Sequence, residues 1–226
     1  MIDQVLDNPI WHSLVTGHRA LSRGGELARR FDRKVSPLMG IREESAGAFA
    51  ELRGLLGDGG PGVLFSRGPL RVPGGLKVIK SMTILQMVCP APRPGPGAEI
   101  VRLGREDVPE MLALTAATGP GPFSEDTIEM GRYYGIRSED GRLAAMAGER
   151  LLLDGYQEVS AVCTDPAFRG KGYAQALVAK VAGQIAAEGR TPFLHVKTQN
   201  ASAVAAYERV GFETCGETVV TVVVSE

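Results

Sequence analysis

A short glycine-rich loop between a strand and a helix holds the residues whose chemistry is easiest to read. The loop reads Arg169-Gly-Lys-Gly-Tyr-Ala174, follows an apolar strand that ends at Thr164, and leads directly into an amphipathic helix. Glycine lets backbone N–H groups approach a ligand closely, and a helix N-terminus adds unpaired N–H groups and a partial positive charge. The pattern therefore predicts a phosphate or pyrophosphate site, with Arg169 and Lys171 adding charge at its rim.

Two common nucleotide-binding loops do not fit this segment. A Walker loop needs serine or threonine after its lysine, and Gly172 follows Lys171 here. A dinucleotide fingerprint needs glycine or alanine at its third conserved position, where this chain has Gln175. The strand, loop and helix therefore suit a phosphate site of another class.

A second motif lies about 30 residues downstream, beyond a helix and a strand. It combines Asn200, Ala203, Tyr207, Glu208 and the pair Gly211-Phe212 in the pattern N-x-x-A-x-x-x-Y-x-x-x-G-F. Together the two motifs resemble the signatures of the GNAT superfamily of acyl-CoA-dependent acyltransferases. The resemblance covers about residues 99–226. More loosely, the N-terminal half looks like a degenerate, half-sized copy of the fold that precedes the catalytic domain in one GNAT subgroup.

The resemblance implies a binding role for two segments. Acetyl-CoA, or another acyl-CoA, is the expected co-substrate. The end of one strand would pair its backbone with the pantetheine arm, and that strand would splay from the strand at 193–197 to admit the acyl chain. A backbone N–H there, at Val162, would polarise the thioester carbonyl. Asn200 would bind the pantetheine arm or an ordered water. The pantetheine residues are Val162, Cys163 and Thr164, and the pyrophosphate residues are Arg169, Gly170, Lys171, Gly172, Tyr173 and Ala174.

The resemblance also implies the catalytic groups. A neutral primary amine would attack the thioester directly, with Tyr207 as the acid facing the CoA sulfur. Glu158 would be a carboxylate base acting through water, and Glu149 is the second candidate. Because a thioester is already activated, holding the two reactants together would supply much of the rate. An alternative function is a non-catalytic acyl-CoA-binding module or sensor.

Each candidate also has a purely structural interpretation. Tyr207 could pack on a helix face, Glu158 could be a solvated charge at a strand edge, and Asn200 could cap the helix that begins at Ala201. Cys163 is expected to be a buried strand residue because no nearby histidine would activate it as a nucleophile. His195 alternates with apolar neighbours and is expected to be structural.

Hydrophobic periodicity and turn residues predict the elements that position these groups. A helix over residues 3–16, interrupted near Pro9, is expected at the start, and Ser45 is expected to cap a helix that ends at Leu56. The fold class is α/β: a mixed sheet of GNAT type with splayed central strands, preceded by a smaller α/β domain. Strands are expected at 63–66, 76–89, 99–103, 133–137, 143–152, 157–164, 193–197, 212–214 and 218–224, and helices at 105–118, 124–131, 172–187 and 201–210.

A proline-rich segment at 90–98 predicts a linker between an N-terminal domain at 1–89 and the acyltransferase domain at 99–226. Residues 1–98 carry a formal charge of +5 and residues 99–226 a charge of −6. These charges could be solvated surfaces or attract the two halves to each other, or the acidic half could attract a cationic amine.

The composition also indicates the cellular compartment and the classes of binding partner. Three cysteines without a CxxC pair argue against disulfides and structural zinc, which favours a cytoplasmic protein without a metal. A net charge of −1 and the lack of a long apolar run predict neither nucleic-acid nor membrane binding. The acceptor is expected to be a small-molecule or peptide amine, and the protein a monomer or homodimer.

Overall fold

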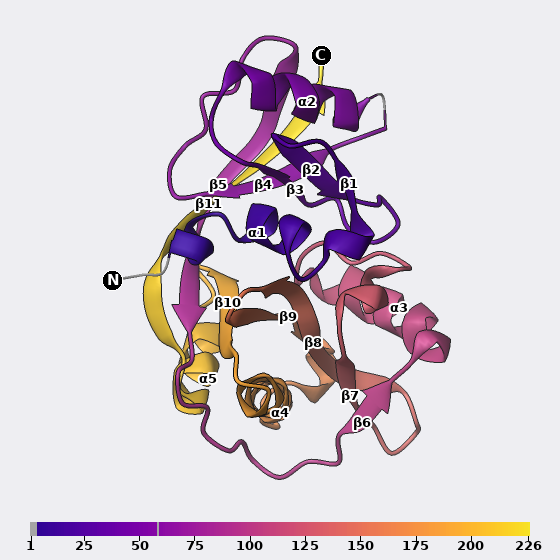
Figure 1. The fold of residues 1–226 in the computed structure, drawn as a ribbon. Helices are drawn as coiled ribbons and strands as arrows, with labels where there is room; N and C mark the ends of the chain where they lie inside the picture. Colours follow the sequence, from indigo (N-terminus) through magenta and orange to yellow (C-terminus); the bar gives the residue numbers. More distant parts are fainter. Residues whose placement is uncertain (1–3, 58) are drawn as a thin grey trace.

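One large mixed sheet runs through the molecule (Figure 1). The computed structural model describes residues 4–57 and 59–226. The strands of this sheet are β4 Gly62–Ser66, β5 Leu76–Val88, β6 Val101–Leu103, β7 Tyr133–Arg137, β8 Leu143–Leu153, β9 Tyr156–Thr164, β10 Thr191–Lys197 and β11 Glu213–Ser225. Their order across the sheet is β4-β11-β5-β10-β9-β8-β7-β6. Among the described residues, β9 and β10 form a parallel pair and the other neighbours are antiparallel.

The N-terminal half adds a small three-stranded sheet and two helices. Its elements are α1 Pro9–Val15, β1 Ser22–Gly24, β2 Ala28–Phe31, β3 Met39–Ile41 and α2 Ala46–Leu56. Pro9 occupies the first turn of α1, where its missing N–H is harmless, and the Ser45 side chain accepts a hydrogen bond from the Ala48 N–H to cap α2. A bridge between Leu38 and Val63 joins the small sheet to β4.

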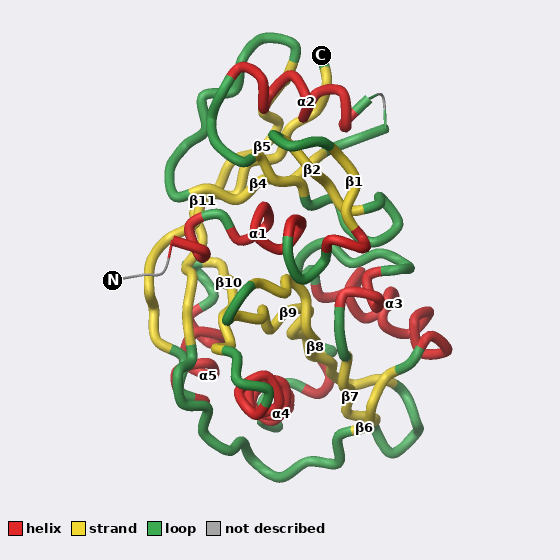
Figure 2. The backbone as a smooth tube through the Cα atoms, in the orientation of Figure 1, coloured by secondary structure: helices red, strands yellow, loops and turns green. Residues whose placement is uncertain are grey.

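Two long strands connect the halves of the molecule. β5 and β11 have 13 residues each and pair from Glu213↔Val88 to Ser225↔Leu76. Figure 2 shows both strands rising from the lower part of the fold into the upper part, beside α2. β5 also pairs with β10, so a strand that precedes the predicted linker lies inside the sheet formed by the strands that follow it.

Helices cover both faces of the large sheet. α4 Tyr173–Ala187 and α5 Ala201–Val210 pack on one face, while α1 and α3 Val108–Thr118 pack on the other. α4 buries Leu177, Val178, Val181 and Ile185 in the core, as expected of the amphipathic helix after the glycine loop. Within the described residues, no helix is long and apolar enough to cross a lipid bilayer.

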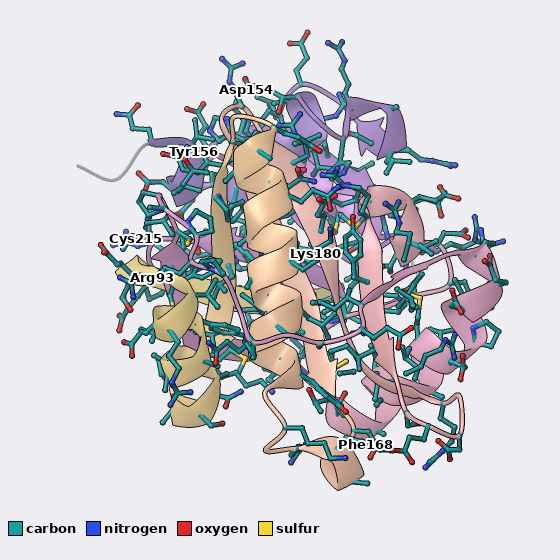
Figure 3. The ribbon with its side chains drawn as sticks, turned by 90° about the horizontal axis from the view of Figure 1, so that it is seen from below. Arg93, Asp154, Tyr156, Phe168, Lys180 and Cys215 are labelled. Carbon is teal, nitrogen blue, oxygen red and sulfur yellow. The ribbon has the colours of Figure 1, made fainter. Side chains whose placement is uncertain are left out.

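The proline-rich segment at 90–98 is a loop that crosses the outside of α4 (Figures 2 and 3). A side chain added at Gly95 would lie 2.8 Å from the Ala179 Cβ, so the loop packs closely on the helix. It connects β5 to β6 at the far edge of the sheet. The strands on both sides of this loop share one sheet. The division of the chain into two domains stays a prediction.

Several predicted elements need correction. The helix expected at 124–131 is a single 3-10 turn at Thr127–Met130, and the Thr127 hydroxyl accepts a hydrogen bond from the Ser124 N–H. The two strands expected after residue 212 form the single strand β11, which a bulge between Thr214 and Gly216 keeps continuous. The helix expected at 3–16 is interrupted near Pro9 as predicted, but the part before the break is a 3-10 turn at Gln4–Asp7, and Asp3 lies outside the described residues. The sheet β1-β2-β3 was not predicted.

Candidate active site

A cavity of about 1150 Å³ brings most of the predicted site residues together. It extends from the glycine loop at residues 169–174, past the ends of β9 and β10, to the inner face of the N-terminal half. Two predicted residues do not line it: Lys171, whose Nζ lies 5.3 Å from the Phe168 ring centre, and Glu158, which is buried behind the wall. The predicted residues that line it are Val162, Cys163, Thr164, Arg169, Gly170, Gly172, Tyr173, Ala174, Asn200 and Tyr207.

The glycine loop has the backbone geometry of an anion site. Gly170 and Gly172 have φ of +80° and +78°, the left-handed region that glycine tolerates best. Gly172 is the N-cap of α4, and its carbonyl accepts the hydrogen bond from the Ala176 N–H. This is the first hydrogen bond within the helix, so the N–H groups of residues 173–175 have no carbonyl partner inside it and face the loop. Figure 3 shows Phe168, just before this loop, and Asp154 of the β8–β9 turn beyond opposite ends of α4.

The two central strands separate beside this loop, which confirms the predicted splay. Parallel pairing of β9 with β10 ends at Phe193↔Glu158, although β9 continues to Thr164 and β10 to Lys197. A bulge in β9 lies beside the gap, and within it Ala161 has a φ of +53°. Because a bulge leaves backbone groups outside the ladder, this segment can offer them to a ligand in the gap.

Two polar groups of the cavity wall are suited to an acyl-CoA. The buried Thr164 hydroxyl has no hydrogen-bond partner among the described residues, so it is an unsatisfied group that a ligand can satisfy. The Tyr207 side chain on α5 is 7% exposed and forms no hydrogen bond within the described part of the chain. Burial, with the nearby Cys163 thiol, raises the pKa of Tyr207 to about 12. The phenol therefore stays protonated at neutral pH and can donate its proton.

A buried polar cluster lies where β9 and β10 separate. Arg150 of β8 donates from Nε to Glu158 Oε2 and from Nη2 to Oε1, both at 2.7 Å, and His195 Nδ1 lies 2.7 Å from the same Oε1. Burial alone would raise the pKa of Glu158, but the Arg150 guanidinium and the His195 ring outweigh it and lower the pKa to about 2. Glu158 is thus an anion with both oxygens engaged.

The cluster continues into the N-terminal half. Gln86 of β5 lies 3.2 Å from His195, joining Nε2 to Nε2, and its own Oε1 accepts a hydrogen bond of 2.9 Å from Arg67. With the carboxylate at Nδ1, that ring nitrogen carries the proton and His195 Nε2 accepts from Gln86. The Phe65 ring of β4 packs edge-on against His195 with centres 4.8 Å apart.

These contacts do not support either carboxylate as the proton acceptor. Glu158 has a low pKa and does not reach the cavity, although the sequence placed it in the correct strand. Glu149 is 2% exposed, accepts hydrogen bonds from the Arg132 side chain and N–H, and also lies outside the cavity wall. Their engagement by arginine could not be read from the sequence. The only hint was the pair Glu149-Arg150 within an otherwise apolar strand.

The other predicted residues lie as follows. Asn200 caps α5, because its Oδ1 accepts from the Ala203 N–H at 3.3 Å, and it also lines the cavity. Burial raises the pKa of Cys163 to about 11, which agrees with a structural thiol. Sequence reasoning missed the wall contributed by the N-terminal half. That wall comprises Leu38, Val63, Phe65, Lys80, Met82 and Ile84, and it shares the cavity with Tyr207.

Comparisons with known proteins identify the family to which this fold belongs. The family described as FR47-like protein matches residues 133–221, from β7 into β11. A crystal structure of a GNAT-family protein from Novosphingobium aromaticivorans DSM 12444 is 39% identical, with a TM-score of 0.91 over 99% of this chain and 100% of that one. The chain belongs to the GNAT family.

More distant structures share the fold of this GNAT protein. A GCN5-related N-acetyltransferase from Kribbella flavida has a TM-score of 0.65 at 18% identity, covering 92% of each chain. An acetyltransferase of the GNAT family from Colwellia psychrerythraea has a TM-score of 0.52 at 15% identity over 89% of this chain and 84% of that one. No curated protein sequence matches significantly. The family and its fold support acyl transfer in general for this chain.

Proposed function

We propose that this GNAT protein transfers an acetyl or another short acyl group from acyl-CoA to the primary amine of a small molecule. One observation carries the proposal: a single cavity joins the glycine loop, the gap between β9 and β10, and Tyr207 to the inner face of the N-terminal half. The first three features fit the successive parts of an acyl-CoA molecule. The fourth provides a separate chamber for an acceptor.

The co-substrate would lie along the cavity from loop to gap. Backbone N–H groups at the start of α4 would hold the pyrophosphate, with Arg169 adding positive charge. The free edge of β9 from Val162 to Thr164 would pair with the pantetheine arm, and the Thr164 hydroxyl would gain its missing partner. The acyl carbonyl would then lie in the gap, where the Val162 N–H could polarise it.

The reaction would be direct. The amine nitrogen attacks the thioester carbon, the C–N bond forms and the C–S bond breaks. The amine releases its N–H proton to solvent, while Tyr207 donates its phenolic proton to the departing thiolate and later regains one from solvent. General acid assistance of this kind typically contributes about 10²–10⁴-fold to the rate.

The cavity itself favours the neutral amine that this reaction needs. No aspartate or glutamate lines it among the described residues, whereas Lys80, Arg150 and Lys197 do. Loss of hydration and nearby positive charge both lower the pKa of an amine. A bound ammonium would therefore lose its proton readily, and no dedicated carboxylate base is required. This arrangement also argues against attraction of a cationic acceptor by the acidic half of the chain.

The N-terminal half favours a small acceptor. Val63, Phe65 and Met82 line the cavity that contains Tyr207, so this half lies over the acceptor end of the site. A free amino acid or a similar compact amine would fit such a chamber more easily than a lysine on a folded protein.

Binding and turnover can be tested separately. Calorimetric titration with CoA and acetyl-CoA should give micromolar affinity in the wild type and none in Gly172→Glu, because the carboxylate would occupy the pyrophosphate position. Release of free thiol with a panel of small amines then tests transfer. Tyr207→Phe should lower kcat by about 100-fold while leaving the CoA Kd unchanged.

Tyr133→Phe is the matched control, since Tyr133 is also buried but its hydroxyl contacts the Thr127 carbonyl outside the cavity. Its kcat should stay near the wild-type value. If acetyl-CoA binds but no amine releases thiol, a non-catalytic acyl-CoA-binding module replaces the enzyme. If a folded wild-type sample binds neither nucleotide, the proposal is wrong.

A further inference from the structure

The outer edge of Arg150 is an unused hydrogen-bonding fork in the wall of the cavity. Arg150 uses one side of its guanidinium, Nε and Nη2, to bind both oxygens of Glu158. A guanidinium carries five N–H donors, so this side-on pairing leaves Nη1 and the second Nη2 hydrogen free. Nη1 has no hydrogen-bond partner among the described residues, and Arg150 lines the cavity although its side chain is only 10% exposed.

The cluster behind Arg150 holds this edge in place. Glu158 is fixed by Arg150 and by His195, and His195 is fixed in turn by Gln86. The Phe65 ring packs on one face of the Arg150 guanidinium, with its centre 6.0 Å from Arg150 Cζ. An arginine held at one edge and packed on one face loses little further freedom when it binds a ligand. The free edge is therefore preorganised.

The surroundings of this edge indicate what it binds. The part of the cavity wall that comes from the N-terminal half and β11 is largely apolar, with Lys80 as a charged member. Its apolar residues are Leu38, Val63, Ile84, Val220 and Val222. A planar fork of two N–H donors matches a carboxylate. Glu158 already neutralises Arg150, so the charge of a ligand carboxylate would be balanced by Lys80 and Lys197 of the same cavity wall. A monoanion therefore suits the site better than a phosphate dianion.

We infer that the acceptor is an amino acid with an apolar side chain, whose carboxylate binds the outer edge of Arg150 and whose side chain lies against the apolar wall. This inference rests on the proposed function, since it names the acceptor of the same site. The carboxylate would orient the amine toward the gap between β9 and β10. Glu158 and His195 are then positioning residues that act through Arg150.

Matched amines test the inference on the wild-type protein. Leucine with isopentylamine, and phenylalanine with phenethylamine, form pairs that differ only in the carboxylate, and phenylalaninamide keeps the shape without the charge. With acetyl-CoA present, thiol release and product mass give kcat/KM for each. A site built around a charged hydrogen bond rejects analogues that lack it strongly, so the amino acid of each pair should exceed its amine by at least about 100-fold.

The variant Arg150→Lys keeps a positive charge beside Glu158 but removes the fork. It should reduce the preference for phenylalanine over phenethylamine by at least about 10-fold, while the acetyl-CoA Kd stays close to wild type. Arg142→Lys is the matched control, because Arg142 forms an exposed pair with Asp140 outside the cavity and should change none of these values.

A binding measurement separates the two possible failures. N-acetylphenylalanine should bind the CoA complex in calorimetry, N-acetylphenethylamine should bind far more weakly, and Arg150→Lys should remove the difference. Equal turnover or equal binding of the carboxylate and decarboxylated compounds overturns this inference and leaves the acyltransferase proposal intact. Carboxylate-dependent binding without transfer to any amine supports the site and contradicts the proposed activity.

Discussion

Replacement of Glu158 by glutamine removes one charge from a buried ion pair and keeps the side-chain shape. The two side chains are 1% and 10% exposed, so the Arg150 cation would lose its counter-charge where water cannot replace it. Breaking a buried pair on one side typically costs about 3–5 kcal/mol. The lowered pKa of Glu158, about 2 against an ordinary value of 4.5, corresponds to about 3 kcal/mol. We therefore expect Glu158→Gln to lower the free energy of unfolding at pH 7 by about 3 kcal/mol.

The same variant should also change how the free energy of unfolding depends on pH. A carboxylate with a lowered folded-state pKa stabilises the protein above its unfolded pKa of 4.5, and this stability is lost as the pH falls toward 2. Urea unfolding at pH 7 and at pH 3 measures this loss of stability. The difference in free energy of unfolding between wild type and Glu158→Gln should fall to about half at pH 3. Wild-type stability should decline more steeply with acid than that of the variant.

An exposed pair in the same protein is the matched control. Arg142 Nε and Asp140 Oδ2 are also 2.7 Å apart, but the two side chains are 64% and 58% exposed. Asp140→Asn should leave the urea midpoint unchanged within experimental error, because water screens an exposed pair. If Glu158→Gln and Asp140→Asn unfold at the same urea concentration at pH 7, burial does not determine the strength of these pairs and the reasoning is refuted.

Two further predictions concern the cavity wall. Gly172→Ala should lower the free energy of unfolding by about 1–2 kcal/mol and weaken CoA binding in calorimetry, because its φ is +78° and the new Cβ would lie 3.3 Å from Pro96. Gly183→Ala in the middle of α4 meets nothing within 4 Å and should instead stabilise by about 0.5–1 kcal/mol, so equal effects would contradict the geometry. Cys163, whose pKa burial raises to about 11, should react slowly with iodoacetamide at pH 7.5 by mass spectrometry, and more slowly still with acetyl-CoA bound. Fast labelling that acetyl-CoA does not change would contradict the placement of Cys163 in the cavity.

Local signals in the sequence predicted several elements in both halves of the fold. Ser45 caps α2, as its residue type predicted, and Gly211 ends α5 at a φ of +105°, as glycine commonly does at a helix C-terminus. Gly170 and Gly172 of the glycine loop adopt positive φ, a conformation that glycine tolerates best. Each of these features depends on residues within one turn of the chain, where side-chain type and backbone preference agree.

Contacts across the sheet could not be predicted from the sequence. Arg150 meets Glu158 because irregular pairing of β8 with β9, between Glu149 and Leu152, sets their register, and no local signal specifies that irregularity. Gln86 and Phe65 reach His195 only because β5 and β4 join the large sheet. His195 was expected to be structural from its alternation with apolar neighbours, which reports burial but not hydrogen-bond partners. The polar cluster is therefore a product of tertiary structure.

The position of β5 has a consequence for how the protein is made. β5 leaves the ribosome early, but its partners in the sheet are β10 and β11, which are synthesised much later. Until both emerge, a 13-residue strand with unpaired edges must remain unassembled, and such edges invite association with other chains. Pairing between distant segments is also slow, because the intervening chain must close a long loop first. We therefore expect the final assembly of the sheet, and with it the candidate active-site cavity, to follow synthesis of β11, and nascent chains that stop before this strand to depend on chaperones.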